Sequence, residues 1–292
     1  MATVQYGEIT AATDGALISI VMPLLHTKLL AAGWTLEYVD ADAIGSGSAE
    51  TPAWDKAPVT NTDAGVAVYR MPANGAFTRW YARIRPGWAA NTNRPHIRGV
   101  TVGSGHAGDG VLTGSTSEIV PSIANAQTDN RQVYVAASED GFYLNWYAGS
   151  STDATTHVER IRLMDESVQD EVIAFNRFNN FQSAFLSASL GGSNLDFTSA
   201  MSLQTQSSSS VGVNPDAQWA MSLYADTWLF VGPFWPIGDP LTGLPRLWRI
   251  APAMNVAAGT TIQVDVDGGL KTYKVASTPW SNQVGMLVVA TE

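Results

Sequence analysis

The sequence contains no cysteine, which excludes disulfide bonds and any site that uses a thiolate as nucleophile or metal ligand. Lysine is nearly absent too, with four residues at positions 28, 56, 271 and 274. Charged residues form 14% of the 292-residue chain, against about 25% in an average soluble domain. Neutral polar residues must therefore cover the surface. Such a surface loses little side-chain entropy when it packs against a neighbour, so the composition favours permanent protein contacts.

Clusters of basic residues are also missing. The net charge is -10 and the isoelectric point is about 4.8, whereas nucleic-acid binding requires clustered Lys and Arg. The nearest approach is Arg79, Arg83 and Arg85, which alternate with Trp80, Ala82 and Ile84. Alternation of this kind indicates a strand with one buried face. We therefore expect no nucleic-acid partner.

Long apolar segments are lacking as well. The longest apolar run extends from Ala16 to Met22 and stops at Pro23, which is too short to span a bilayer. The N-terminus has neither the basic nor the apolar region of a signal peptide. We expect a soluble protein that is made in a cytoplasm and has no membrane partner.

Metal-binding patterns are not found. The four histidines stand at positions 26, 96, 106 and 157, and no two have the i, i+4 spacing of a helical metal site. Asp265 and Asp267 faintly resemble a calcium loop, but the other ligand positions and the closing Glu are missing. The Gly-rich stretch from Gly103 to Gly110 continues into strand-like residues without Lys, so it is not a phosphate loop. We expect no metal and no cofactor.

Catalytic patterns are equally weak. His106 is near Asp109, but nothing in the sequence places a nucleophile beside them. The carboxylate pairs Glu139/Asp140 and Asp165/Glu166 lie in expected turns, where acidic residues are common. Glycosidases take their two carboxylates from distant positions, so a glycan hydrolase stays open as a third alternative. We expect no catalytic residues and a non-enzymatic protein.

One helix is expected, over residues 16–32. Its apolar residues recur at helical spacing, Thr13 or Asp14 can cap its start, and Gly33 can end it. The apolar stripe comprises Ile18, Val21, Met22, Leu25, Leu29 and Leu30. We expect a neighbouring chain or the adjoining domain to bury this stripe in part, and Ile18, Leu25 and Leu29 are candidate interface residues.

The rest of the chain has mainly two-residue periodicity with turn signals every ten or so residues. These segments are 34–39, 65–71, 77–85, 96–102, 132–137, 142–147, 157–164, 261–266, 270–275 and 284–291. Residues 166–190 suit either a helix or bent strands. The pattern predicts a mainly β fold of antiparallel sandwich-like or barrel-like modules with one N-terminal helix.

Composition divides the chain into four parts. Residues 1–150 form a domain with the helix and a β module, and 151–203 form a β or mixed connecting segment. Residues 204–217 are a polar, Ser-rich loop, and 218–292 form an aromatic-rich β module.

Eight of the ten tryptophans fall into two groups. Those within strand-like patterns are expected in the core: Trp34, Trp80, Trp146 and Trp228. Those beside Pro, Gly or polar loop residues are expected to be partly exposed: Trp54, Trp88, Trp235 and Trp280. Exposed aromatic residues anchor interfaces and also stack on sugar rings. We expect at least one of these four to lie in an interface between chains.

Several segments together resemble tailed-bacteriophage virion proteins over about half the chain. The first unit is a helix, Leu29-Leu-Ala-Ala-Gly-Trp34 entering a strand, a loop with Trp54, and Ala64-Gly-Val-Ala-Val-Tyr69 beside Trp80-Tyr-Ala-Arg-Ile84. Similar strand pairs follow in Arg131-Gln-Val-Tyr-Val-Ala-Ala137 and Gly141-Phe-Tyr-Leu-Asn-Trp-Tyr-Ala-Gly149. The C-terminal pieces are Leu244-Pro-Arg-Leu-Trp-Arg-Ile250, Ala258-Gly-Thr-Thr-Ile262 and Gly269-Leu-Lys-Thr-Tyr-Lys-Val275.

The resemblance implies a virion component of the tail tip, baseplate, neck or head surface. Such a protein is made in the host cytoplasm, contacts copies of itself and other virion proteins, and has no functional residues beyond its contact surfaces. The alternative from another class is a carbohydrate- or receptor-binding module, on a virion or secreted, with a host-surface glycan as its partner.

Overall fold

The computed structural model describes most of the N-terminal two thirds of the chain and several C-terminal strands. The described residues are 3–11, 17–88, 95–115, 118, 131–148, 152–162, 168–178, 188–190, 222–224, 227–229, 235–236, 242–243, 247–252, 257, 259–266, 269–277 and 285–292.

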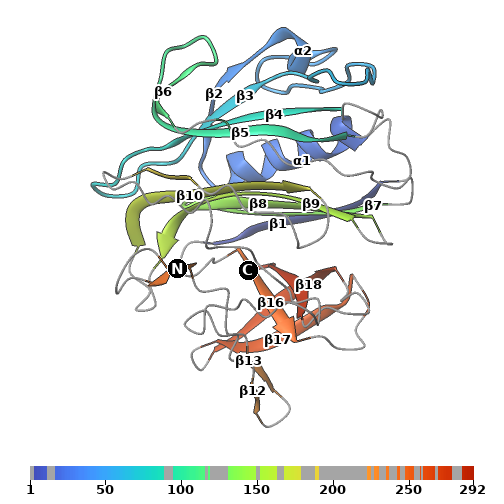
Figure 1. Ribbon diagram of the computed structural model, residues 1–292, viewed down its shortest axis with the longest axis vertical. Coiled ribbons are helices and arrows are strands. Elements are labelled where there is room, and N and C mark those ends of the chain that lie inside the picture. The colour runs from blue at the N-terminus through green and yellow to red at the C-terminus, as the bar shows by residue number, and fades with distance from the viewer. Residues whose placement is uncertain are drawn as a thin grey trace.

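Two antiparallel sheets form the body of the molecule, with a helix between them (Figure 1). The first sheet has the order β1 (Gln5–Ala11), β7 (Arg131–Ser138), β8 (Gly141–Ala148), β9 (Thr152–Arg162), β10 (Val168–Phe178) and β11 (Ala188–Leu190). The second has the order β2 (Thr35–Val39), β3 (Ala67–Arg70), β4 (Tyr81–Trp88), β5 (Pro95–His106) and β6 (Leu112–Ser115). A one-turn helix, α2 (Ala41–Ile44), follows β2. The predicted mainly β fold with antiparallel sheets is confirmed.

The C-terminal residues form a third sheet that lies beneath the first in Figure 1. Its order is β12 (Ser222–Tyr224), β13 (Thr227–Leu229), β17 (Thr261–Val266), β18 (Gly269–Ser277), β19 (Gly285–Ala290) and β16 (Trp248–Pro252). All neighbours are antiparallel except β13 and β17. β14 (Trp235–Pro236) and β15 (Thr242–Gly243) pair separately. The predicted strands 261–266, 270–275 and 284–291 therefore correspond to β17, β18 and β19.

The helix α1 (Leu17–Ala31) is the longest helix in the described part of the chain and matches the predicted range of 16–32. It ends as the sequence indicates. Gly33 adopts a positive φ of 88°, which a residue without Cβ tolerates, and the Trp34 backbone N–H donates to the Leu29 carbonyl at 3.0 Å. This turn passes the chain directly from α1 into β2. No helix in the described residues is long and apolar enough to cross a membrane.

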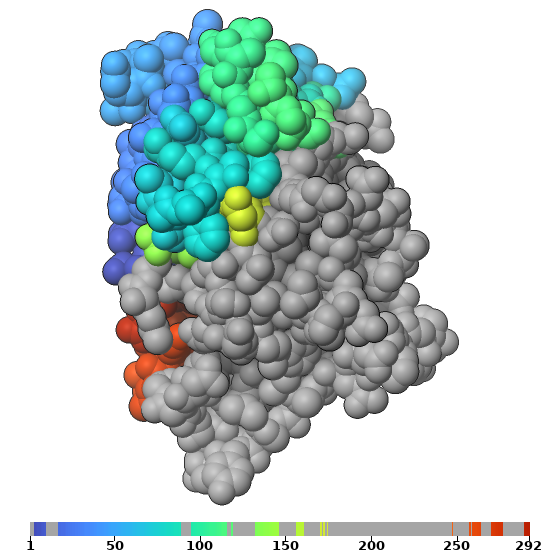
Figure 2. Space-filling model, turned by 90° about the vertical axis from the view of Figure 1, so that its left-hand side faces the viewer, coloured from blue at the N-terminus to red at the C-terminus, as the bar shows by residue number. Residues whose placement is uncertain are grey.

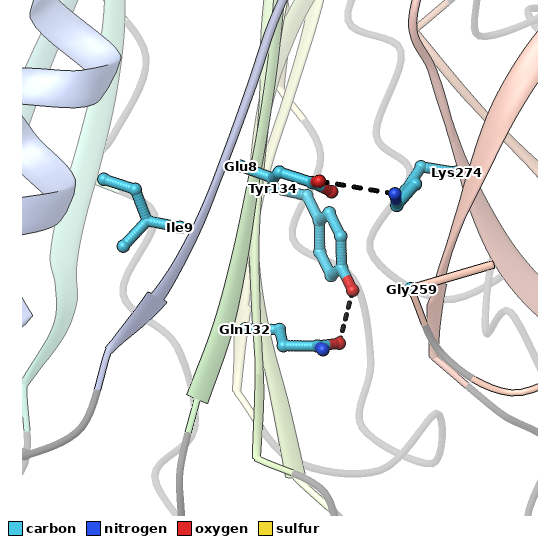
Figure 3. Close-up of a pocket in the computed structure, with 6 residues that line it drawn as sticks. All are labelled: Glu8, Ile9, Gln132, Tyr134, Gly259 and Lys274. Atoms are coloured by element: carbon cyan, nitrogen blue, oxygen red, sulfur yellow. Dashed lines mark hydrogen bonds and ion pairs between the residues drawn. The ribbon is translucent and has the colours of Figure 1, made fainter. Parts of the chain in front are cut away.

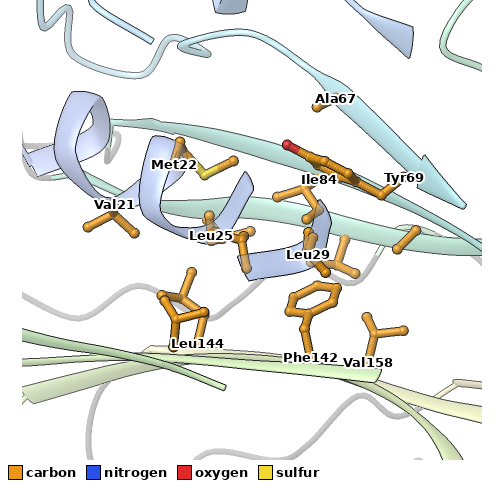
Figure 4. Packing of buried hydrophobic residues seen from close by; sticks show 14 of the residues in the cluster. Val21, Met22, Leu25, Leu29, Ala67, Tyr69, Ile84, Phe142, Leu144 and Val158 are labelled. Atoms are coloured by element: carbon orange, nitrogen blue, oxygen red, sulfur yellow. The ribbon is translucent and has the colours of Figure 1, made fainter. Parts of the chain in front are cut away.

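The apolar stripe of α1 fills the space between the two sheets, except for Leu30, which is 41% exposed. Val21, Leu25 and Leu29 are buried against Phe142 and other residues of the first sheet and against the second sheet above (Figure 4). The proposed interface role of Ile18, Leu25 and Leu29 is therefore wrong. Their own chain covers them completely, because the helix has a sheet on each side instead of lying at the molecular surface.

Residues 168–178 and 188–190 of the ambiguous segment 166–190 form strands, so the helical alternative is wrong for these residues. The rest of the segment lies outside the described residues. β10 pairs along β9, and residues 188–190 of β11 pair with β10. The first sheet thus runs across position 150, where composition placed a boundary. The Ser-rich loop at 204–217 lies outside the described residues.

Candidate functional site

A seam between the first sheet and the C-terminal sheet forms the candidate site. Along β7 the side chains alternate, so that Val133 and Val135 join the core around α1 while Gln132 and Tyr134 face the opposite side. β18 and β19 lie against that outer face at β7, and β18 also approaches β8. The C-terminal sheet thereby covers the outer face of the first sheet at β7 and β8.

A pocket of about 300 Å³ lies in this seam, lined by Glu8, Ile9, Gln132, Tyr134, Gly259 and Lys274 (Figure 3). Glu8 comes from β1, and Gln132 and Tyr134 come from β7, where Tyr134 stands directly opposite Glu8 in the antiparallel register. Lys274 projects from β18 on the far side. The Ile9 side chain points to the other side of β1, so polar side chains dominate the pocket.

The polar groups of the pocket contact one another across the seam. Lys274 Nζ lies 3.3 Å from Glu8 Oε1, which makes an ion pair between the two sheets. Tyr6 donates its hydroxyl hydrogen to Glu8 Oε2 at 2.7 Å. Tyr134 donates its hydroxyl hydrogen to Gln132 Oε1 at 2.5 Å. The charges of Glu8 and Lys274 cancel, so the pocket is polar but has no net charge.

Burial and the neighbouring Glu8 carboxylate change the pKa of Tyr6. Burial disfavours the phenolate, and the neighbouring Glu8 carboxylate both accepts the phenol hydrogen and repels a second negative charge, so the pKa of Tyr6 is raised. Tyr6 therefore remains a hydrogen-bond donor to Glu8 at neutral pH and holds that carboxylate in place.

Gly259 leaves space in the pocket because it has no side chain. Its φ of 85° is favourable only for glycine, and a Cβ at this position would lie 3.5 Å from Gln132 Nε2 and 4.0 Å from the Tyr134 hydroxyl. Any larger side chain would thus occupy the space in front of the Gln132 amide.

Chemically, this arrangement is suited to hydrogen bonding. Glycoside hydrolysis needs two carboxyl groups about 5 to 9 Å apart, and the lining holds one, from Glu8. Within the described residues, no group of three or more His, Asp or Glu side chains could hold a metal ion.

His157, His106 and His26 bond to groups of their own chain. His157 Nε2 lies 2.8 Å from Glu159 Oε2, with both side chains buried. His106 Nε2 accepts a hydrogen bond from the Gly110 backbone N–H at 3.1 Å. His26 contacts the Tyr69 hydroxyl and the Glu50 carbonyl at 3.1 and 3.0 Å. These contacts give each ring a structural role.

The basic residues of β4 are neutralised on the sheet itself. Arg85 bonds to both Glu118 and Asp63, and Arg83 bonds to Glu118 at 3.0 Å. Burial alone would lower the pKa of Arg85, but these carboxylates outweigh it and raise that pKa. The predicted alternation is confirmed, because Trp80, Ala82 and Ile84 are buried and the arginines stand on the other face.

The expectation that Trp54 and Trp88 are exposed interface residues is wrong, because their exposed fractions are 0% and 1% within their own chain. The loop after α2 folds back onto that helix, where the Trp54 backbone N–H donates to the Ala43 carbonyl at 2.9 Å. The Trp88 N–H likewise donates to the Thr62 carbonyl at 2.9 Å. These backbone bonds turn both rings inward.

Of the other six tryptophans for which an environment was predicted, two have side chains that the structure describes. Trp34 and Trp80 are buried as predicted, and Trp34 Nε1 donates to the Ser138 carbonyl at 2.8 Å. Trp280 lies outside the described residues, and so do the side chains of Trp146, Trp228 and Trp235.

Comparison with known proteins gives no relative from which a function could be transferred. No family model matches the chain, and no curated protein matches it. The sequence and the geometry of this chain are therefore the basis for its proposed function.

The seam pocket was not foreseen from the sequence. Its residues come from three segments separated by more than a hundred positions, and each segment matches an ordinary strand or turn pattern. Only the pairing of β1 with β7 and the docking of β18 bring them together.

Proposed function

We propose that this chain is a non-enzymatic structural component of a bacteriophage virion, which acts through contacts with copies of itself and with other virion proteins. The proposal combines the resemblance of the sequence with a surface composition suited to permanent interfaces. The observation that carries it is the exposed arm formed by residues 104–115.

This arm consists of the end of β5, a turn and the strand β6, and β6 is the last strand of its sheet. It forms the green region near the top of Figure 2. Its exposed residues are Ser104, Ala107, Gly108, Asp109, Val111, Thr113, Gly114 and Ser115. End strands of monomeric proteins usually carry Lys or other charged residues, or Pro, and these residues prevent pairing with another chain. Here Asp109 is the one acidic residue, and Val111 is 56% exposed.

The arm is held in one conformation by its own hydrogen bonds. The Ala107 N–H donates to the Val111 carbonyl at 3.0 Å, and Asp109 Oδ1 accepts from the Val111 N–H at 3.0 Å. The His106 ring packs against Tyr38 and Tyr81, with centroid distances of 6.0 and 5.9 Å. A surface that is already ordered loses less entropy on binding, which supports an interface at this arm.

Light scattering on Val111→Asp tests the proposal. We expect the wild-type chain to form an oligomer of two or more 31.1 kDa chains. Val111→Asp should reduce the mass of this oligomer, because a buried contact would then contain an unpaired charge. Val59→Asp is the matched control, since Val59 is 49% exposed in a loop of the same body. Its assembly should equal that of the wild type. An unchanged assembly of Val111→Asp, with a normal circular dichroism spectrum, would contradict the proposal.

The alternative of a carbohydrate- or receptor-binding module is supported by one feature, the polar pocket in the seam.

A further inference from the structure

The seam pocket retains hydrogen-bonding capacity after its internal contacts are made. Gln132 uses its amide oxygen for Tyr134, which leaves the two hydrogens of Nε2 directed at the space beside Gly259. The Lys274 ammonium contacts one Glu8 oxygen and has three hydrogens. The Glu8 carboxylate has about four acceptor positions, of which two are used by Tyr6 and Lys274.

Donors and acceptors are thus mixed within one small space. An anion in this pocket would face the Glu8 carboxylate, and a cation would face the Lys274 ammonium. A neutral hydroxyl group suits both, because it donates to a carboxylate and accepts from an ammonium or an amide. Adjacent hydroxyl groups on one ring would match the pair of Glu8 and Lys274, whose charged atoms are 3.3 Å apart.

The size of the pocket limits the ligand to one ring. A volume of about 300 Å³ is at the lower end of the range for small-molecule sites. The Glu8 side chain is 45% exposed, so the pocket opens to solvent and can admit the end of a longer chain. Tyr134 is almost completely buried and offers no ring face for stacking. Binding therefore depends on hydrogen bonds.

We propose that the seam pocket binds a single neutral pyranose ring, through hydrogen bonds from its adjacent hydroxyl groups to Glu8, Lys274 and the Gln132 amide. The site is separate from the arm at 104–115, so its failure would leave the assembly proposal unaffected. The ring can be a free monosaccharide or the terminal unit of a glycan, since both present the same hydroxyl groups.

Saturation-transfer NMR on the full chain, with methyl glycosides of glucose, galactose, mannose and N-acetylglucosamine, tests the site. At least one glycoside should bind, and inorganic phosphate should not displace it. Lys274→Met should weaken binding about tenfold, as expected for loss of a hydrogen bond to a charged group. The control Lys271→Met removes a lysine from the same strand outside the pocket lining and should leave binding unchanged.

A second variant keeps the test valid if Lys274→Met disturbs the seam. Gln132→Glu preserves the oxygen that accepts from Tyr134 but removes both amide hydrogens. It should weaken glycoside binding while the thermal unfolding midpoint stays near that of the wild type. Immobilised glycans that end in the same sugars distinguish a terminal unit from a free sugar. Binding of no glycoside, displacement by phosphate, or equal weakening in Lys271→Met would overturn the proposal.

Discussion

Buried polar residues join the two sheets of the body at one end. Arg160 of β9 is fully buried, and its Nη1 donates to Asp140 Oδ1 at 3.1 Å. Its Nη2 donates to the Thr78 carbonyl at 2.6 Å, and its guanidinium lies 5.5 Å from the centre of the Phe77 ring. Thr78 and Phe77 belong to the connection between β3 and β4. One arginine of the first sheet thus orders a turn of the second.

Removing this arginine should destabilise the fold. Arg160→Met leaves the Asp140 carboxylate buried without this partner, and breaking a buried pair on one side costs about 3–5 kcal/mol of unfolding free energy. Urea unfolding followed by tryptophan fluorescence measures the loss. The double variant Arg160→Met, Asp140→Leu should lose less than the sum of its single variants. An Arg160→Met chain that unfolds at the wild-type urea concentration would show that the pair does not hold the turn.

His26 should make stability depend on pH. Because Nε2 faces the Glu50 carbonyl, it carries the hydrogen, and Nδ1 accepts from the Tyr69 hydroxyl. Burial lowers the pKa of His26, against a smaller opposing effect of the Glu50 bond. The folded state therefore binds the proton less well than the unfolded state.

The contribution of His26 is complete above the ordinary histidine pKa of about 6.5 and is lost as the pH falls through the lowered folded value. We expect the difference in unfolding free energy between wild type and His26→Gln to shrink below about pH 6.5. Urea titrations at several pH values measure it. A difference that stays constant from neutral to acidic pH would contradict this account.

At the scale of elements, α1 supplies the centre of the core. Leu25→Ala should reduce the unfolding free energy by about 2–5 kcal/mol, because the cavity would lie between two sheets. Leu30→Ala makes the same change on the same helix at a residue that is 41% exposed, and should cost less than about 0.5 kcal/mol. Thermal unfolding of both variants gives the comparison, and equal losses would refute the burial of this stripe.

Elements with strong periodicity could be predicted from the sequence. The 3.6-residue spacing and Gly33 defined α1 almost to its ends, and alternation from Arg79 to Arg85 identified the buried face of β4. The burial of Trp54 and Trp88 could not be predicted, because the Pro, Gly and polar residues beside each tryptophan are the same whether its ring points outward or inward. Long-range backbone bonds decide the direction, and they have no local signal.

At the scale of the whole molecule, the packing of the sheets against one another could not be predicted from the sequence. The helix was expected to be covered by a neighbouring chain or by the adjoining domain. Its burial comes from two sheets of its own chain, one of which is assembled from β1 and strands more than a hundred residues later. The seam pocket depends on the same distant pairing. What composition did indicate, a surface with few charges, is seen at the arm of residues 104–115.

Sedimentation velocity of the wild-type chain over a range of concentrations tests the proposed assembly most directly. The proposal predicts a species with a mass of two or more times 31.1 kDa that persists on dilution, as expected for a permanent interface. A single species of 31.1 kDa at every concentration would contradict it.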